Sequence, residues 1–226
     1  MINIKIRGEQ FLQSKWARFS SGSHTKKLLR RRPELRNIEK EQATARQELL
    51  PFYDNYIHSI STDGMAVSLE LATFCLALCR LMKPKRILDL GSGFSSFVFR
   101  RYTKEAGGEV VSVDDDARWL GKTQQYLAKE QLSVQNLFEW SNKPAVKGEF
   151  DLVLHDLGNR YTRGDVLPDI YALAAKNGVI ILDDFHKPDY AVRVKKFIVS
   201  QNNQFYSVYK YTIDKFARYS VVVIKQ

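Results

Sequence analysis

The chain has 226 residues, of which 44% are hydrophobic and 27% charged, an ordinary composition for one globular α/β domain with an appendage. It contains no run approaching the ~20 apolar residues of a membrane span, so a protein built on transmembrane helices is excluded. Cys75 and Cys79 lie four residues apart, a spacing that suits one buried helix face better than a disulfide or a zinc site. We therefore expect core thiols and a reducing, cytoplasmic location.

The formal net charge of +10 is concentrated near the N-terminus. Residues 1–50 contain 12 Lys and Arg against 5 Glu, and the densest segment is Lys-Lys-Leu-Leu-Arg-Arg-Arg at 26–32. A solvated helical arm explains this charge most simply. A binding patch for nucleic acid or for an anionic membrane surface is the second interpretation. An organelle transit segment is the third, because residues 10–33 contain no acidic residue.

The first 60 residues are expected to form this basic helical arm and a cap, and residues 61–226 the main domain. Pro33 suits the first position of a helix, which is expected to end before Pro51. An aromatic-rich connector is expected over residues 53–60.

From residue 62 onward the pattern alternates between helices and strands. Thr62 or Asp63 can cap a helix that runs to Met82. The strands expected after it are, in chain order, 86–89, 109–114, 133–140, 149–156, 179–184, 204–209 and 219–225. Helices are expected between them at 95–104, 117–130, 165–175 and 190–200. This alternation predicts a doubly wound α/β fold with a mostly parallel seven-stranded sheet. Its last two strands should form an antiparallel hairpin, because their link is too short for a crossover helix.

The most informative segment is Asp-Leu-Gly-Ser-Gly at 89–93, where a buried strand opens into a glycine turn. The two glycines allow a sharp turn and the close approach of a ligand. The carboxylate that precedes them would repel a pyrophosphate but suits a ligand that carries an ammonium group. Asp114 ends the next strand and can accept bonds from both hydroxyls of a ribose on the same rim. An NAD-binding domain fits less well, because Ser96 stands where its third glycine would be.

With these motifs in this order, the chain resembles the class I S-adenosylmethionine-dependent methyltransferases, which have a Rossmann-like fold. The resemblance rests on the glycine turn, the acidic end of strand 109–114, the segments 150–156 and 176–184, and the closing hairpin. It implies S-adenosylmethionine as the cofactor, with the glycine turn at its methionine end, Asp114 at its ribose and the loop at 139–140 at its adenine. The cofactor-binding residues that it implies are Asp89, Gly91, Ser92, Gly93, Ser96, Asp114, Asp115, Glu139, Trp140 and Asp156.

Carboxylates at the ends of two neighbouring strands add a likeness to the catechol-type O-methyltransferases, which use a metal ion. The expected metal ligands are Asp156, Asp183 and Asp184. Oxygen ligands of this kind suit Mg²⁺, which in those enzymes also binds the hydroxyls of the substrate. Those enzymes carry a lysine base shortly after the first Asp, whereas this chain has Gly-Asn-Arg at 158–160.

A different catalytic base is therefore needed. His186 is the expected base, because an imidazole titrates near neutrality, and Asp156 is the second expected catalytic residue. His155 is the other histidine near the motifs, but its place inside a strand points it away from Asp156.

The resemblance implies transfer of a methyl group from S-adenosylmethionine to an acceptor, and an oxygen of a small molecule is the expected acceptor. Two alternatives stay open. One is an RNA methyltransferase that uses residues 26–32 to bind its substrate, and the other is a non-catalytic binding module with the same fold. A homodimer is a further expectation.

Overall fold

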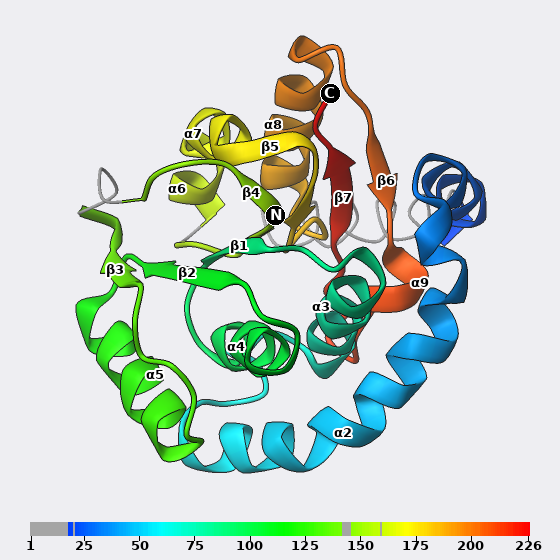
Figure 1. Cartoon of the computed structure of the whole chain (residues 1–226). Coiled ribbons are helices and arrows are strands. Elements are labelled where there is room, and N and C mark those ends of the chain that lie inside the picture. Colours follow the sequence, from blue (N-terminus) through cyan, green and yellow to red (C-terminus); the bar gives the residue numbers. More distant parts are fainter. Residues whose placement is uncertain (1–17, 20, 142–145, 159) are drawn as a thin grey trace, which may run out of the picture.

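A computed structural model describes residues 18–19, 21–141, 146–158 and 160–226. One seven-stranded sheet forms its centre, in the order β3-β2-β1-β4-β5-β7-β6 (Figure 1). The strands are β1 (Arg86–Leu90), β2 (Glu109–Asp114), β3 (Leu137–Glu139), β4 (Phe150–His155), β5 (Ala174–Leu182), β6 (Phe205–Ser207) and β7 (Val221–Ile224). The first five run parallel, whereas β7 pairs antiparallel with both β5 and β6. The predicted sheet and its closing antiparallel pair are confirmed.

Helices cover both faces of the sheet (Figure 1). One face carries α2 (Ile38–Ser59), α3 (Leu69–Met82), α4 (Phe94–Ala106) and α5 (Ala117–Lys129), and the other carries α6 (Arg160–Asp165), α7 (Leu167–Leu173) and α8 (Pro188–Ser200). A 3₁₀-helix, η1 (Pro33–Asn37), precedes α2, and the short α9 (Tyr209–Thr212) links β6 to β7. Alternate residues of β1 enter the two cores: Ile87 packs toward α3 and α4, and Leu88 toward α7 and α8.

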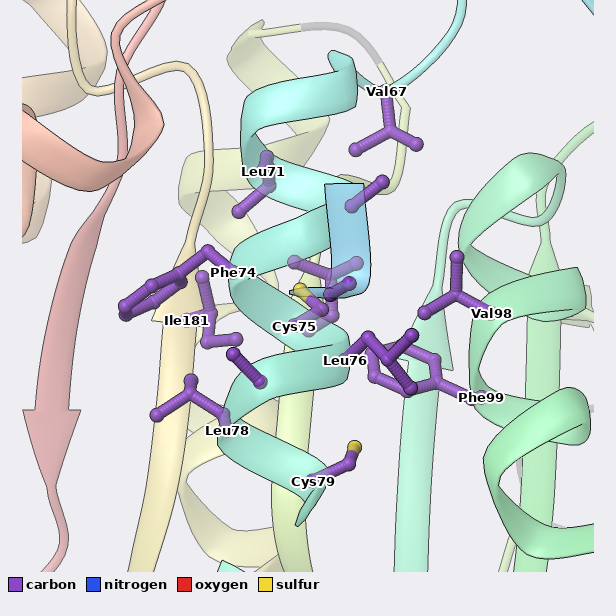
Figure 2. Close-up of a cluster of buried hydrophobic side chains, with 14 of the residues drawn as sticks. Val67, Leu71, Phe74, Cys75, Leu76, Leu78, Cys79, Val98, Phe99 and Ile181 are labelled. Carbon is purple, nitrogen blue, oxygen red and sulfur yellow. The ribbon is translucent and has the colours of Figure 1, made fainter. Parts of the chain in front are cut away.

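Helix α3 has apolar residues on nearly every side, so all of its sides can be buried by neighbouring elements. Figure 2 shows it between Ile181 of β5 and the α4 side chains Val98 and Phe99. Cys75 and Cys79 are fully buried free thiols on this helix, as predicted. Burial raises the pKa of both thiols, so they stay protonated and unreactive.

The prediction that a helix ends before Pro51 is wrong, because α2 continues through Pro51 to Ser59. The aromatic residues expected in a connector therefore lie on a helix, where Tyr53 and Tyr56 pack against Phe94 at ring-centre distances of 5.2 and 5.3 Å. Proline has no backbone N–H, so the helix lacks one hydrogen bond at Pro51. Burial of these two rings compensates for that loss and stabilises the last turns of the helix. The cap of α3 was also misplaced: its first turn is capped by Ser68, whose hydroxyl accepts from the Leu71 amide at 3.1 Å.

Residues 21–31 form a helix beyond β6, at the edge of the sheet (Figure 1). His24 accepts a bond from the Ser207 amide of β6, and Arg32 donates to the Asn177 carbonyl. Leu28 is buried in the core shared with α3, so the helix shields an edge strand. Its basic residues, Lys26, Lys27, Arg30 and Arg31, are exposed. The rest of the predicted arm, residues 1–17, lies outside the described residues.

The strand boundaries differ most from expectation at β3 and β5. Strand β3 spans only Leu137–Glu139, and β5 begins earlier, at Ala174, where an irregularity in its pairing with β4 replaces the end of the predicted helix. None of the helices in the described part of the chain is long and apolar enough to cross a membrane.

Candidate active site at the carboxyl ends of the strands

The glycine turn after β1 is shaped by close backbone contacts. Gly91 has a φ of +98°, and a Cβ atom there would lie 2.6 Å from the carbonyl oxygen of Asp156. Gly93 has a φ of +150°, and a Cβ atom there would lie 3.0 Å from the Tyr56 hydroxyl. Only glycine fits both positions. The second glycine lies at the N-terminus of α4 in the wall of a cavity, where backbone N–H groups and the helix dipole favour a negatively charged group.

A cavity of about 240 Å³ opens at this turn. Its walls come from the glycine turn, the end of β2, the start of α5, the loop after β4 and the segment before α3. The lining residues are Tyr56, Met65, Ala66, Val67, Gly91, Ser92, Gly93, Phe94, Ser95, Asp114, Asp116, Trp119, Asp156 and Gly158.

Asp114 links this cavity to the glycine turn. One of its carboxylate oxygens accepts from the Ser92 amide at 2.7 Å and from the Ser92 hydroxyl at 2.8 Å. The other accepts from the Asp116 amide at 3.0 Å. Burial raises the pKa of Asp114, and these hydrogen bonds oppose the rise. A carboxylate can accept about four hydrogen bonds, so Asp114 keeps acceptor capacity for a ligand in the cavity.

Tyr56 supplies a buried polar atom to the wall of this cavity. Its side chain is fully buried, it lines the cavity, and its hydroxyl has no hydrogen-bond partner among the described residues. Trp119 also lines the cavity and donates its indole N–H to the Ser92 carbonyl at 2.7 Å. A buried hydroxyl without a partner is costly, so it indicates a place for a ligand atom.

A second cavity, of about 540 Å³, adjoins the first. Both are lined by Met65, Ala66, Asp156 and Gly158. The second also has the end of β5 and the loop before β7 in its walls. Its other lining residues are Gly64, Arg163, Asp183, Asp184, His186, Lys187, Phe216 and Arg218. Two ligands could therefore meet at the loop that follows β4.

The segment 63–66 forms a wall of both cavities and is tied to the loop before β7. Arg218 donates to the carbonyls of Asp63, Gly64 and Ala66 at 3.1–3.2 Å. It also bonds the buried carboxylate of Asp214 at 2.6 Å. These bonds fix the segment over the site.

His186 lies in the wall of the second cavity, with its side chain 19% exposed. Its Nδ1 atom is 3.5 Å from Asp184, too far for a good hydrogen bond. Burial lowers the pKa of His186, although the Asp184 and Asp183 carboxylates oppose this, so the imidazole is neutral at pH 7. His155, in contrast, is completely buried and bonds the Arg163 carbonyl through Nε2 at 2.9 Å.

Arg163 of α6 joins the ends of β4 and β5. Its guanidinium forms an ion pair with Asp156 at 2.7 Å and another with Asp184. It also donates to the carbonyls of Asp156 and Gly158, both at 2.9 Å, and of Leu157 at 3.4 Å. The side chain is only 6% exposed.

Comparison with known proteins agrees with this architecture. No family model matches the chain. A curated relative, methyltransferase str3 of Strobilurus tenacellus, is 32% identical over 114 residues, which is 48% of this chain but only 38% of the relative's length. The O-methyltransferase TomG of Streptomyces achromogenes, solved in complex with SAM, has a TM-score of 0.61 at 15% identity, covering 82% of this chain and 90% of that chain. An O-methyltransferase from Bacillus cereus in complex with SAH has a TM-score of 0.58 at 14% identity, covering 80% and 91%.

The fold is that of the class I methyltransferases.

Within this methyltransferase fold, the predicted cofactor residues fall into three groups. Five of them line the first cavity, namely Gly91, Ser92, Gly93, Asp114 and Asp156. Asp89 and Ser96 are instead fully buried beneath the turn, where the Ser96 hydroxyl bonds Asp89 and accepts from the Gly93 amide. These two residues shape the turn from below, a role different from the predicted contact with the cofactor.

The remaining predicted cofactor residues lie beside the first cavity. Asp115 is exposed, and its carboxylate approaches Gly158. Glu139 is level with Asp114 on the neighbouring strand, and Trp140 is half-buried at the end of β3. Residues 142–145, which follow them, lie outside the described part of the chain.

The predicted Mg²⁺ site is not formed by these aspartates. They do lie near one another at the ends of β4 and β5, but Arg163 bonds Asp156 and Asp184, and Asp183 accepts from the Ser220 hydroxyl at 2.7 Å. Lys187 also pairs with Asp184. Within the described residues no cluster of three such side chains could hold a metal ion. The donor set is already neutralised by cations of the chain, so it does not fit Mg²⁺.

Residues whose roles depend on tertiary contacts could not be predicted from the sequence. Tyr56 falls in the expected connector, because Pro51 predicts the end of a helix. Arg163 has no local signal, since an arginine in a polar helix is usually solvated. Trp119 has a weak local signal as an aromatic residue in the first turn of the helix after β2, where its indole N–H reaches the Ser92 carbonyl.

Proposed function

We propose that the protein transfers a methyl group from S-adenosylmethionine to an oxygen of a small-molecule acceptor. The observation that carries this proposal is the pair of adjoining cavities, which share Asp156 and Gly158 at the end of β4. One cavity has the features of a nucleoside and amino-acid site, and the other has a neutral imidazole in its wall. Holding two reactants side by side in fixed orientation is the main requirement of such a transfer.

The residues of the first cavity fit S-adenosylmethionine. The cavity wall at Gly93 and the Tyr56 hydroxyl would receive the methionine end of the cofactor. The remaining acceptor capacity of Asp114 suits the ribose hydroxyls, and Glu139 and Trp140 of the adjacent strand would border the adenine. When bound, the cofactor supplies an electrophilic methyl group on a sulfonium.

In the second cavity, His186 would remove the proton of the acceptor hydroxyl. Its neutral form can accept a proton, and the resulting imidazolium would be stabilised by Asp184 at 3.5 Å. Asp156 lies where the two cavities join and is held there by Arg163. Burial raises the pKa of Asp156, while the Arg163 guanidinium opposes this. Asp156 would orient the acceptor hydroxyl toward the methyl group.

A small acceptor is favoured over RNA by the placement of the basic helix. Lys26, Lys27, Arg30 and Arg31 are exposed beyond β6, whereas the acceptor cavity adjoins β4 and β5 under the segment 63–66. Phosphates bound to the helix would lie at the sheet edge, two strands away from β5. The basic face therefore does not lead an RNA strand to the cavity.

A transfer assay with S-adenosylmethionine labelled in its methyl group tests this proposal and its alternatives. The protein is incubated with a pool of hydroxyl-bearing small molecules and, separately, with total RNA. We expect the label in the small-molecule pool, in an amount equal to the S-adenosylhomocysteine formed. Label in RNA, lost steeply as salt rises, would contradict the small-molecule acceptor. Binding of the cofactor without label in either pool would favour the non-catalytic module.

A further inference from the structure

The oxygen atoms around Arg163 form a shell of the kind that hard metal cations prefer. Five oxygens surround its guanidinium. Four accept hydrogen bonds, namely one carboxylate oxygen of Asp184 and the backbone carbonyls of residues 156, 157 and 158, and a carboxylate oxygen of Asp156 lies 2.7 Å away in an ion pair. A mixed set of carboxylate and carbonyl oxygens is typical of a Ca²⁺ site. Here these oxygens surround the guanidinium of Arg163, which is almost completely buried.

The ion pairs of this side chain show what its removal would leave behind. Arg163 pairs with Asp156 and with Asp184, and Lys187 also pairs with Asp184. Without the guanidinium, Asp156 would lose its ion pair and Asp184 would keep only Lys187. A buried carboxylate that has lost its partner is strongly unfavourable, so a cation from solution could take the place of the guanidinium.

We propose that Arg163 is a built-in cation that takes the place of a divalent metal ion at the acceptor side of this site. It acts as a positioning residue: it fixes Asp156 at the junction of the two cavities and holds the loop after β4 against the end of β5. The functional part of this inference rests on the proposed methyl transfer, whereas the exchange of guanidinium for metal does not.

One consequence concerns the acceptor. A metal ion with open coordination positions can bind two vicinal hydroxyls of a substrate. The Arg163 guanidinium donates to four oxygens of the protein, pairs with Asp156 and is only 6% exposed, so it offers no pair of open positions to a substrate. The class of acceptor that this site suits is therefore a compound with a single reacting hydroxyl, without the need for a catechol.

The test is a Ca²⁺ titration of the R163A variant, with R80A as the matched control. Arg80 also lies between two carboxylates, Glu41 and Glu48, but on the surface of two helices and without a carbonyl shell. We expect Ca²⁺ to bind R163A at one ion per chain and to raise its Tm by about 5 °C at saturation. The wild type and R80A should show neither effect, and the double variant R163A/D184N should lose both.

Two results would overturn the proposal. One is a folded R163A that binds no Ca²⁺, and the other is stoichiometric Ca²⁺ binding by the wild type that D184N abolishes. If R163A does not fold in EDTA, Ca²⁺ should restore a cooperative unfolding transition by circular dichroism, and failure to do so contradicts the proposal. None of these readouts involves S-adenosylmethionine, so they are independent of the proposed methyl transfer.

Discussion

At the scale of single residues, the surroundings of His186 decide how it can act. The imidazole is mostly buried, and the nearest acidic group is Asp184, whose charge is already shared by Arg163 and Lys187. Burial acts to raise the pKa of Asp184, but these two cations outweigh it and lower the pKa. Asp184 is therefore charged at neutral pH and acts to raise the pKa of His186, but burial outweighs this effect and keeps the histidine neutral.

The H186Q variant should lower kcat by about 100-fold and leave S-adenosylmethionine affinity unchanged, because the lost group acts only on the acceptor proton. In the wild type, the rate should fall as the pH is lowered, with a midpoint below pH 6.5, because burial lowers the pKa of His186 and its protonation needs a more acidic solution. H58Q is the matched control, as His58 is an exposed histidine on α2. A kcat within two-fold of the wild type in H186Q would remove this histidine from the mechanism.

Some of these residues could be predicted from the sequence and others could not. The positions of Asp114 and Asp156 follow from strand patterns, because an acidic residue that ends a parallel strand lies at the ligand-binding rim. Arg163 could not be predicted, since its contacts arise only when the loop after β4 folds its carbonyls around the guanidinium. The predicted metal ligands were placed together correctly, but the cation between them is supplied by the chain.

At the scale of elements, the glycine turn couples three strands. The Gly91 amide donates to Val113 of β2 at 2.9 Å, and the Asp156 amide after β4 donates to Leu90 at 2.7 Å. A side chain at position 91 would push these strand ends apart, because its nearest neighbour is backbone.

The variant G91A tests this coupling against G107A. Both glycines have positive φ, but a Cβ atom at Gly107 would have nothing within 4 Å. We expect G107A to lower the free energy of unfolding by about 1 kcal/mol through backbone strain alone. G91A should cost at least about 2 kcal/mol more, because backbone atoms must move. Equal costs, measured by urea denaturation, would show that the close approach at Gly91 contributes nothing.

Helix α2 shows where prediction of elements failed. A proline inside a helix usually marks its end, and the sequence after Pro51 contains no compensating signal that acts locally. The helix persists because its last turns bury Tyr53 and Tyr56 against α4 and α5. The strands were easier to predict, because their apolar runs are set by burial on both faces of one sheet.

At the scale of the whole molecule, the site and the basic helix occupy different regions. The cavities lie at the carboxyl ends of β1, β2, β4 and β5, under a segment fixed by Arg218. The helix of residues 21–31 covers the far edge of the sheet and exposes its cations there. The arrangement assigns cofactor and acceptor to one end of the sheet and leaves the basic face free for a structural or docking role.

The central claim is that the first cavity binds S-adenosylmethionine, and calorimetric titration tests it most directly. We predict one S-adenosylmethionine per chain for the wild type and for E109Q, which alters the opposite end of β2. D114A should keep its fold by circular dichroism and lose binding, because the ribose contact is gone. NAD should not bind. A wild-type protein that is folded but does not bind S-adenosylmethionine, or a D114A variant that binds it with unchanged affinity, would contradict this account.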